Sequence, residues 1–186
     1  MMVVNYVVVY LLLLLGGYVL FRIYVRNKYI KKGKLSPLTS FLEFLFFALH
    51  ANSMYVFIPV RWPYLPQLSD NQILYYISLF LIITGLLIVL SSIIPLGYNR
   101  SMGLKSKTLK TDGLYKFSRN PQLSGYGILL IGFAVSYPSI YIAGWIIVYA
   151  IVSYMMAITE EEYLLEIYGE DYKQYCIQVP RFIKIR

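Results

Sequence analysis

Long apolar segments alternate along this chain with short polar ones. A helix that crosses a bilayer needs about 20 mostly apolar residues. Five segments meet this pattern, although the fourth is short: Val3 to Phe21, Phe41 to Val60, Ile73 to Leu96, Leu123 to Tyr137 and Ser139 to Ile158. Only the turn at Pro138 separates the last two, so we expect them to form a tight antiparallel hairpin. The pattern predicts an all-α, polytopic membrane protein with five transmembrane helices.

After the fifth segment, apolar and aromatic residues recur at spacings of three and four. They are Tyr163, Leu164, Ile167, Tyr168, Tyr172 and Tyr175. This spacing predicts an amphipathic C-terminal helix, interrupted near Gly169, that continues the fifth span or begins at a Thr159 cap. No repeat or linker divides the chain. We therefore expect one domain over residues 1–186, with three spans in 1–95 and a loop, the hairpin and the tail helix in 96–186.

The charge pattern indicates an orientation in the membrane. The chain is 59% hydrophobic and 14% charged, whereas soluble domains carry about 25% charged residues. Its net charge is +8, but of the 17 Lys and Arg only Arg61 falls in the second connection. The others lie in the first and third connections and the tail. Because positive loops stay cytoplasmic, the N-terminus is expected outside, and the loop from about Tyr98 to Gln122 is expected to share the cytoplasmic face with the tail. Nucleic acid is not an expected partner.

Two polar clusters flank the predicted hairpin. The loop carries Gly113, Tyr115 and the triplet Arg119-Asn120-Pro121, and the tail begins with the acids 160–162. Three consecutive acids are costly inside a bilayer, so they must lie at or beyond a membrane face. The hairpin would bring them to the entrance of the fourth span, which Pro121 starts. Carboxylates suit a ribose diol or an ammonium, and aromatic faces favour a sulfonium. One Cys and one His do not make a metal site.

The order of these motifs resembles a known enzyme family. Leu109-x-x-x-Gly113-x-Tyr115, Arg119-Asn120-Pro121, Glu160-Glu161, Tyr168-Gly169 and Val179-Pro180-Arg181-Phe182 together resemble the isoprenylcysteine carboxyl methyltransferases and the related phospholipid methyltransferases. The resemblance covers about residues 96 to 182. It implies an integral-membrane O- or N-methyltransferase that uses S-adenosylmethionine without a Rossmann domain. The acceptor it implies is lipid-like or prenylated, and membrane lipids are the expected surroundings.

The resemblance also assigns site residues. It implies that the cofactor is bound by Leu109, Lys110, Tyr115, Asn120, Leu123 and Glu160, and that Arg119 handles the substrate. It identifies no catalytic residue. Three positions depart from the family pattern: Asn120 stands where the family has His, Leu123 where an aromatic is frequent, and Met156 where the carboxyl methyltransferases have Arg. The last departure favours an acceptor other than the prenylcysteine carboxylate.

Other interpretations of the same residues stay open. The acids could form a solvated helix turn, and Arg119 could be a snorkelling anchor. The chain could be a non-catalytic lipid- or partner-binding protein that retains the fold, or a dinucleotide-dependent membrane reductase. The acids argue against a nearby 2′-phosphate, which would need Arg. Glu43 and His50 share one face of the second span, and we interpret both as structural.

Overall fold

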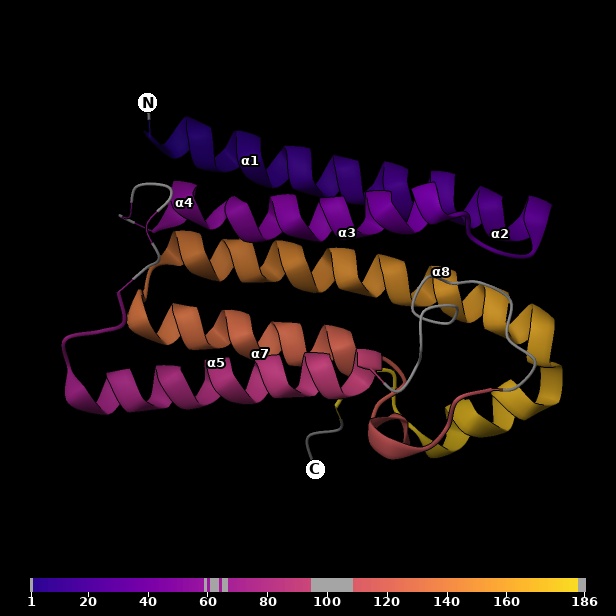
Figure 1. Ribbon diagram of the computed structural model, residues 1–186. Helices are drawn as coiled ribbons and strands as arrows, with labels where there is room; N and C mark the ends of the chain where they lie inside the picture. The colour runs from indigo at the N-terminus through magenta and orange to yellow at the C-terminus, as the bar shows by residue number, and fades with distance from the viewer. Residues whose placement is uncertain (1, 59, 61–63, 65–66, 95–108, 184–186) are drawn as a thin grey trace.

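The computed structural model describes residues 2–58, 60, 64, 67–94 and 109–183. Within these residues all regular structure is helical, and the long helices lie side by side in one bundle (Figure 1). The elements in chain order are α1 (Met2–Gly17), the π-helix η1 (Tyr18–Val25), α2 (Arg26–Lys32), α3 (Pro37–Asn52), α4 (Met54–Phe57), α5 (Gln72–Ile93), the 3₁₀ turn η3 (Gly113–Lys116), α7 (Pro121–Ser136) and α8 (Ile140–Gln178).

Four of the described helical stretches are long and apolar enough to cross a membrane. They are Asn5–Lys32, Pro37–Phe57, Gln72–Ile93 and Ile140–Gln178. The helix α7 is also apolar but has only 16 residues. At 1.5 Å per residue it is about 24 Å long, less than the roughly 30 Å hydrocarbon core. The protein is therefore a polytopic helical membrane protein. The helix α7 coincides with the short fourth span expected from the sequence, and the count of five spans stays a prediction.

The helix ends follow local sequence signals. The Asn71 side chain accepts hydrogen bonds from the backbone N–H of Ile73 and Leu74 and so caps α5, whose predicted end at Leu96 lies outside the described residues. As predicted, α7 begins at Pro121. The first helix continues past the predicted end at Phe21 and stops only at Gly33, which has a φ of 60°.

The longest helix, α8, joins the membrane region to the tail without a break at Thr159. The Thr159 hydroxyl donates to the Met155 carbonyl at 2.8 Å, as in a helix interior, and accepts from Arg22 at 2.9 Å. Thr159 is therefore not a helix cap. The helix changes direction at Gly169, where φ is 51° and ψ is −121°, a conformation that only Gly adopts readily. Along its length α8 contacts α1, η1, α2, α4 and α7.

The helices α5 and α7 pack with their backbones in close approach. A Cβ atom added at Gly85 would lie 2.6 Å from the Gly125 carbonyl oxygen, and one added at Gly125 would lie 2.9 Å from the Gly85 carbonyl oxygen. A hydrogen bond of 2.8 Å joins the hydroxyls of Ser136 and Ser78. Small residues thus let two apolar helices touch, as is common within membranes.

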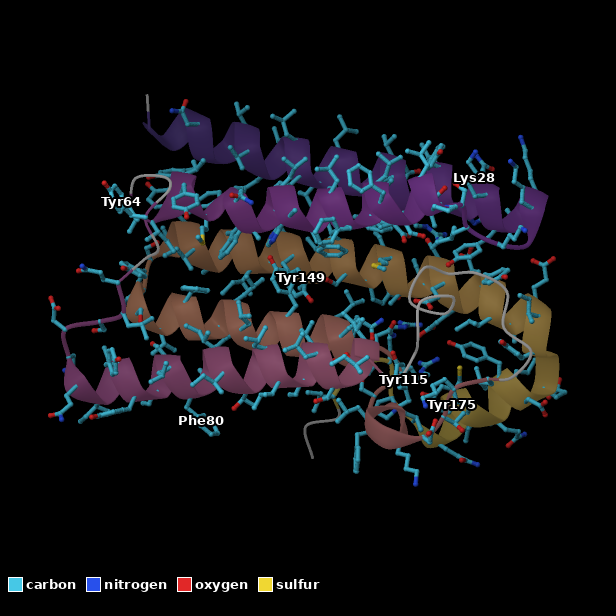
Figure 2. All side chains as sticks on the ribbon, in the orientation of Figure 1. Lys28, Tyr64, Phe80, Tyr115, Tyr149 and Tyr175 are labelled. Carbon is cyan, nitrogen blue, oxygen red and sulfur yellow. The ribbon has the colours of Figure 1, made fainter. Side chains whose placement is uncertain are left out.

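The two ends of the bundle differ in character. Lys28, Tyr115 and Tyr175 lie at one end, where α8 bends, whereas Tyr64 lies at the other (Figure 2). The basic helix α2, the η3 loop and the tail therefore share an end. The predicted cytoplasmic cations Arg100, Lys105 and Lys107 lie outside the described residues.

Candidate functional site

A cavity of about 480 Å³ opens at the end of the bundle where α8 bends. Its walls come mainly from η1 and α2, from α3, from the loop before α7, and from α8 on both sides of Gly169. The lining residues are Val25, Tyr29, Leu35, Ser40, Phe41, Glu43, Phe44, Phe47, Ile93, Leu109, Lys110, Tyr115, Arg119, Gln122, Met156, Glu160, Tyr163, Leu164, Ile167, Tyr168, Tyr172 and Tyr175. The volume lies in the range of about 300–1,000 Å³ that is usual for small-molecule sites.

Hydrogen bonds hold the loop against the tail. The backbone N–H groups of Arg119 and Asn120 donate to the carbonyls of Pro180 (2.9 Å) and Arg181 (3.2 Å). The Tyr175 hydroxyl donates to the Tyr115 carbonyl at 2.7 Å. Figure 2 shows Tyr115 and Tyr175 next to each other, although 60 positions separate them in sequence. The loop and the tail therefore meet, as the sequence predicts.

The consecutive acids Glu161 and Glu162 are held by arginines. The Glu161 carboxylate accepts two hydrogen bonds from Arg181, at 2.9 and 2.7 Å, and forms an ion pair with Arg119 at 3.2 Å. This pairing raises the pKa of the Arg181 guanidinium. Glu162 pairs with Arg22 at 2.9 Å and with Arg26 at 2.6 Å. These two acids tie the tail and the first helix to α8.

Glu160 has no such partner. Its side chain lines the cavity, and no hydrogen bond or ion pair joins it to any residue that the structure describes. Glu43 of α3 also lines the cavity and likewise has no hydrogen bond or ion pair with a described residue. Burying an unpaired carboxylate is unfavourable. The two carboxyl groups in the cavity can therefore bind a cation or accept hydrogen bonds from a ligand.

The polar side chains that the loop contributes to the cavity wall are either uncharged or paired with another side chain of the protein. Burial, and next the charge of Glu160, raise the pKa of the Tyr115 hydroxyl, so that this group stays protonated and can donate a hydrogen bond. Tyr115 donates to the Gln122 side chain at 3.3 Å. Lys110 pairs with Asp112 at 2.9 Å, and the hydrogen bond between them lowers the pKa of the Asp112 carboxyl.

The structure brings five of the seven site residues from the sequence to this cavity: Leu109, Lys110, Tyr115, Arg119 and Glu160. Asn120 and Leu123 do not line it. The Asn120 amide is buried and donates to the Arg181 carbonyl at 3.1 Å, and the Leu123 side chain is also buried. Asn120 thus has its donor engaged in joining the loop to the tail.

Two groups of lining residues were not identified from the sequence. One is Glu43, which we interpreted as structural. The other is the aromatic wall formed by Tyr29, Tyr163, Tyr168, Tyr172 and Tyr175. The spacing of the tail tyrosines indicated one face of a helix, but not that this face lines a site. For Glu43 the available signal was an acid inside an apolar span, which is rare without a function.

A family model described as phospholipid methyltransferase matches residues 73–171, more than half of the chain and most of the span from α5 to the bend of α8. The chain belongs to the phospholipid methyltransferase family. No curated protein and no solved structure gives a significant match.

Membership gives the general chemistry. Phospholipid methyltransferases are methyltransferases that act on lipid-like substrates, and they typically use S-adenosylmethionine. The polar and aromatic side chains that line the cavity suit that cofactor. The free Glu160 carboxylate can accept from hydroxyl or ammonium groups, and the neighbouring tyrosine faces suit a sulfonium. Among the described residues, no group of His, Cys, Asp and Glu could hold a metal ion.

Proposed function

We propose that this protein transfers a methyl group from S-adenosylmethionine to a lipid-like acceptor at the cytoplasmic face of the membrane. The observation that supports this best is Glu160, a carboxylate without a partner among the described residues, in a tyrosine-rich cavity within the family-matched region. In this proposal Glu160, Leu109, Lys110 and Tyr115 bind the cofactor, and Arg119 contacts the acceptor.

Asn120 and Leu123 act in this proposal by positioning. Asn120 fixes the loop on the Arg181 carbonyl. The Leu123 carbonyl accepts a hydrogen bond from Tyr149, which fixes the start of α7 against α8. Both residues would affect cofactor binding through the shape of the wall that carries Tyr115.

When bound, S-adenosylmethionine supplies an electrophilic methyl group on a sulfonium. The protein supplies alignment and a dry environment. Glu160 holds one end of the cofactor, and the aromatic wall with Leu164 and Ile167 excludes water. No imidazole lines the cavity, because the single His50 lies in the core against Trp145. Catalysis therefore rests on alignment and electrostatics.

The acceptor would enter sideways from the bilayer. Phe41 and Phe44 of α3 line the cavity yet are 54% and 69% exposed, so its wall faces the lipid region on this side. Met156 lines the cavity where the carboxyl methyltransferases carry Arg. An apolar wall at this point favours an acceptor without a carboxylate.

Titration calorimetry on the protein in detergent tests the cofactor assignment. We expect the protein to bind S-adenosylmethionine and Glu160→Gln to bind it roughly 10- to 150-fold more weakly, the effect of losing a charged hydrogen bond worth about 1.5–3 kcal/mol. Glu166→Gln removes an equal charge from an exposed position of the same helix and serves as the control.

Failure to bind at millimolar cofactor, with the protein folded, would contradict the proposal. Binding of a reduced dinucleotide instead would favour a reductase. Transfer of labelled methyl to a membrane lipid extract tests the reaction itself. Cofactor binding without any transfer would favour a non-catalytic role.

A further inference from the structure

The first helical span is longer than the membrane core is thick. Asn5–Lys32 forms 28 helical residues, about 42 Å at 1.5 Å per residue, against a hydrocarbon core of roughly 30 Å. Its first charged residue is Arg22, so the uncharged part before Arg22 can fill the core. The seven residues of α2 then extend about 10 Å beyond it. We therefore expect α2 to lie in the layer of lipid headgroups.

One side of α2 is engaged by the rest of the protein. Arg26 pairs with Glu162 of α8 at 2.6 Å. The Tyr29 ring is buried, lines the cavity and stacks on Tyr163 at a centroid distance of 4.0 Å. This side of α2 thus holds α8 and forms part of the cavity wall.

Three lysines occupy another side of α2. Lys31 and Lys32 are exposed, and Lys28 is half-buried with its ammonium 4.9 Å from the centre of the Tyr24 ring. Neighbouring positions of an α-helix point about 100° apart, so the three lysines share one arc of about 100°, and Tyr29 lies outside it. All nine acidic side chains of the chain lie among the described residues, and none of them forms an ion pair with these lysines. The arc therefore carries positive charge that no acidic side chain of this protein pairs with.

We propose that this lysine face of α2, formed by Lys28, Lys31 and Lys32, binds the headgroup of an anionic membrane lipid. Lysines clustered directly beside a membrane span are attracted to negatively charged lipid headgroups. The apolar surroundings favour a lipid over a soluble polyanion. Ile30 on the same helix and Leu38 at the start of α3 are 57% and 61% exposed, and such side chains suit contact with acyl chains. This inference does not depend on the proposed function.

Native mass spectrometry of the protein in a neutral detergent tests this surface. The probes are phosphatidylglycerol and phosphatidylcholine with identical acyl chains, supplied in equal amounts, and the ratio of the two retained lipids gives the preference. We expect phosphatidylglycerol to be preferred by about fivefold for each lysine that contacts it, and the preference to fall as salt is raised. Lys31→Gln/Lys32→Gln should lower the preference by about fivefold or more, whereas Lys31→Arg/Lys32→Arg, which keeps both charges, should retain it.

A matched control removes the same charge elsewhere. Lys116→Gln/Lys173→Gln also deletes two exposed lysines, one on η3 and one on α8 beyond the bend, and should keep the preference. Equal loss in both double variants would overturn the proposal, because net charge and not the lysine face would then be responsible. Thermal unfolding shows that each variant is folded.

A competing anion separates a lipid from a soluble partner. Inorganic polyphosphate is added at the same phosphate concentration as the lipid, and phosphatidylglycerol should stay bound to the unaltered protein. Its displacement would overturn the proposal, because the lysine face would then fit a soluble polyanion. A preference for phosphatidylglycerol that is unchanged in Lys31→Gln/Lys32→Gln would also overturn it.

Discussion

At the scale of single residues, three consecutive acids in α8 have different surroundings. Glu161 and Glu162 are each bound by two arginines, whereas Glu160 faces the cavity without a partner among the residues that the structure describes. Adjacent helix positions point in directions about 100° apart, so a run of identical residues reaches three different environments. The arginines fix the helix, and in our proposal the first acid of the run binds the cofactor.

Loss of the Glu161 carboxylate should mainly affect stability. Glu161→Ala would leave Arg119 and Arg181 without their counter-charge where the acid is only 13% exposed. We expect destabilisation of about 2–4 kcal/mol, somewhat less than for a fully buried pair because Arg181 is partly exposed. Thermal unfolding in detergent measures this. Glu170→Ala removes an exposed pair with Lys173 and should change stability by less than about 1 kcal/mol.

Residue types alone indicated part of the site. The sequence brought Tyr115, Arg119 and Glu160 to attention because their motifs are ordered around a hairpin. The resemblance singled out Glu160 in the run of acids. The sequence did not show that Glu161 and Glu162 are paired, because their arginines come from positions 22, 26, 119 and 181. It also left Glu43 out, because only the packing of α3 near the bend of α8 places that acid in the cavity.

At the scale of elements, two glycines determine how the helices are arranged, for different reasons. Gly85 has no room for a side chain, because α7 passes directly over it. Gly169 has open space around its Cα, but its φ of 51° and ψ of −121° exclude other residues. The first glycine serves packing, and the second redirects the chain.

The packing role predicts a selective effect at Gly85. Gly85→Ala would place a Cβ atom 2.6 Å from both a carbonyl oxygen and a backbone nitrogen of α7, so the helices must separate. We expect a loss of about 1–3 kcal/mol in thermal unfolding. Gly16→Ala is the matched control, because its nearest contact would be an ordinary 3.6 Å to Phe46. Equal effects of both variants would contradict close packing as the cause.

The directional role predicts a functional effect at Gly169. Gly169→Ala imposes about 1–3 kcal/mol of backbone strain at the bend. Relief of that strain would draw Tyr172 and Tyr175 away from Tyr115, since both follow the bend on α8. We expect weaker cofactor binding in calorimetry and a fall of a few degrees in the unfolding midpoint. Normal binding would show that the cavity does not depend on the bend.

Hydropathy predicted the helices well because each apolar span must satisfy its backbone internally. Their ends were harder to predict. The first helix extends to Lys32 because Arg22 and Arg26 find partners on α8, and α8 continues through Thr159 for the same reason. These tertiary contacts are not visible in local sequence.

At the scale of the whole molecule, the basic first connection and the cavity share one end of the bundle, and Tyr64 lies at the other (Figure 2). From the distribution of Lys and Arg we therefore expect the cavity to face the cytoplasm. This orientation can be tested with single cysteines in a Cys176→Ser background. Tyr64→Cys, at a 72% exposed position, should react with a membrane-impermeant thiol reagent in intact cells.

Asn27→Cys, at an exposed position beside Lys28, should react only after the membrane is opened. Asn27 is chosen because its replacement leaves the charge of α2 unchanged. Labelling of both cysteines in intact cells would contradict the assignment of two opposite faces. Labelling of Asn27→Cys alone would place the cavity outside.

The unbroken course of α8 from Ile140 to Gly169 links membrane thickness to the cavity. Glu160 lies 20 residues along this rod, about 30 Å from its start. A change in tilt of about 10° would therefore swing the carboxylate sideways by ~5 Å. Lipids of different acyl length alter the tilt of long helices. The length of the surrounding hydrocarbon chains should therefore change the distance between Glu160 and the η3 loop, and with it the affinity for a ligand bound between them.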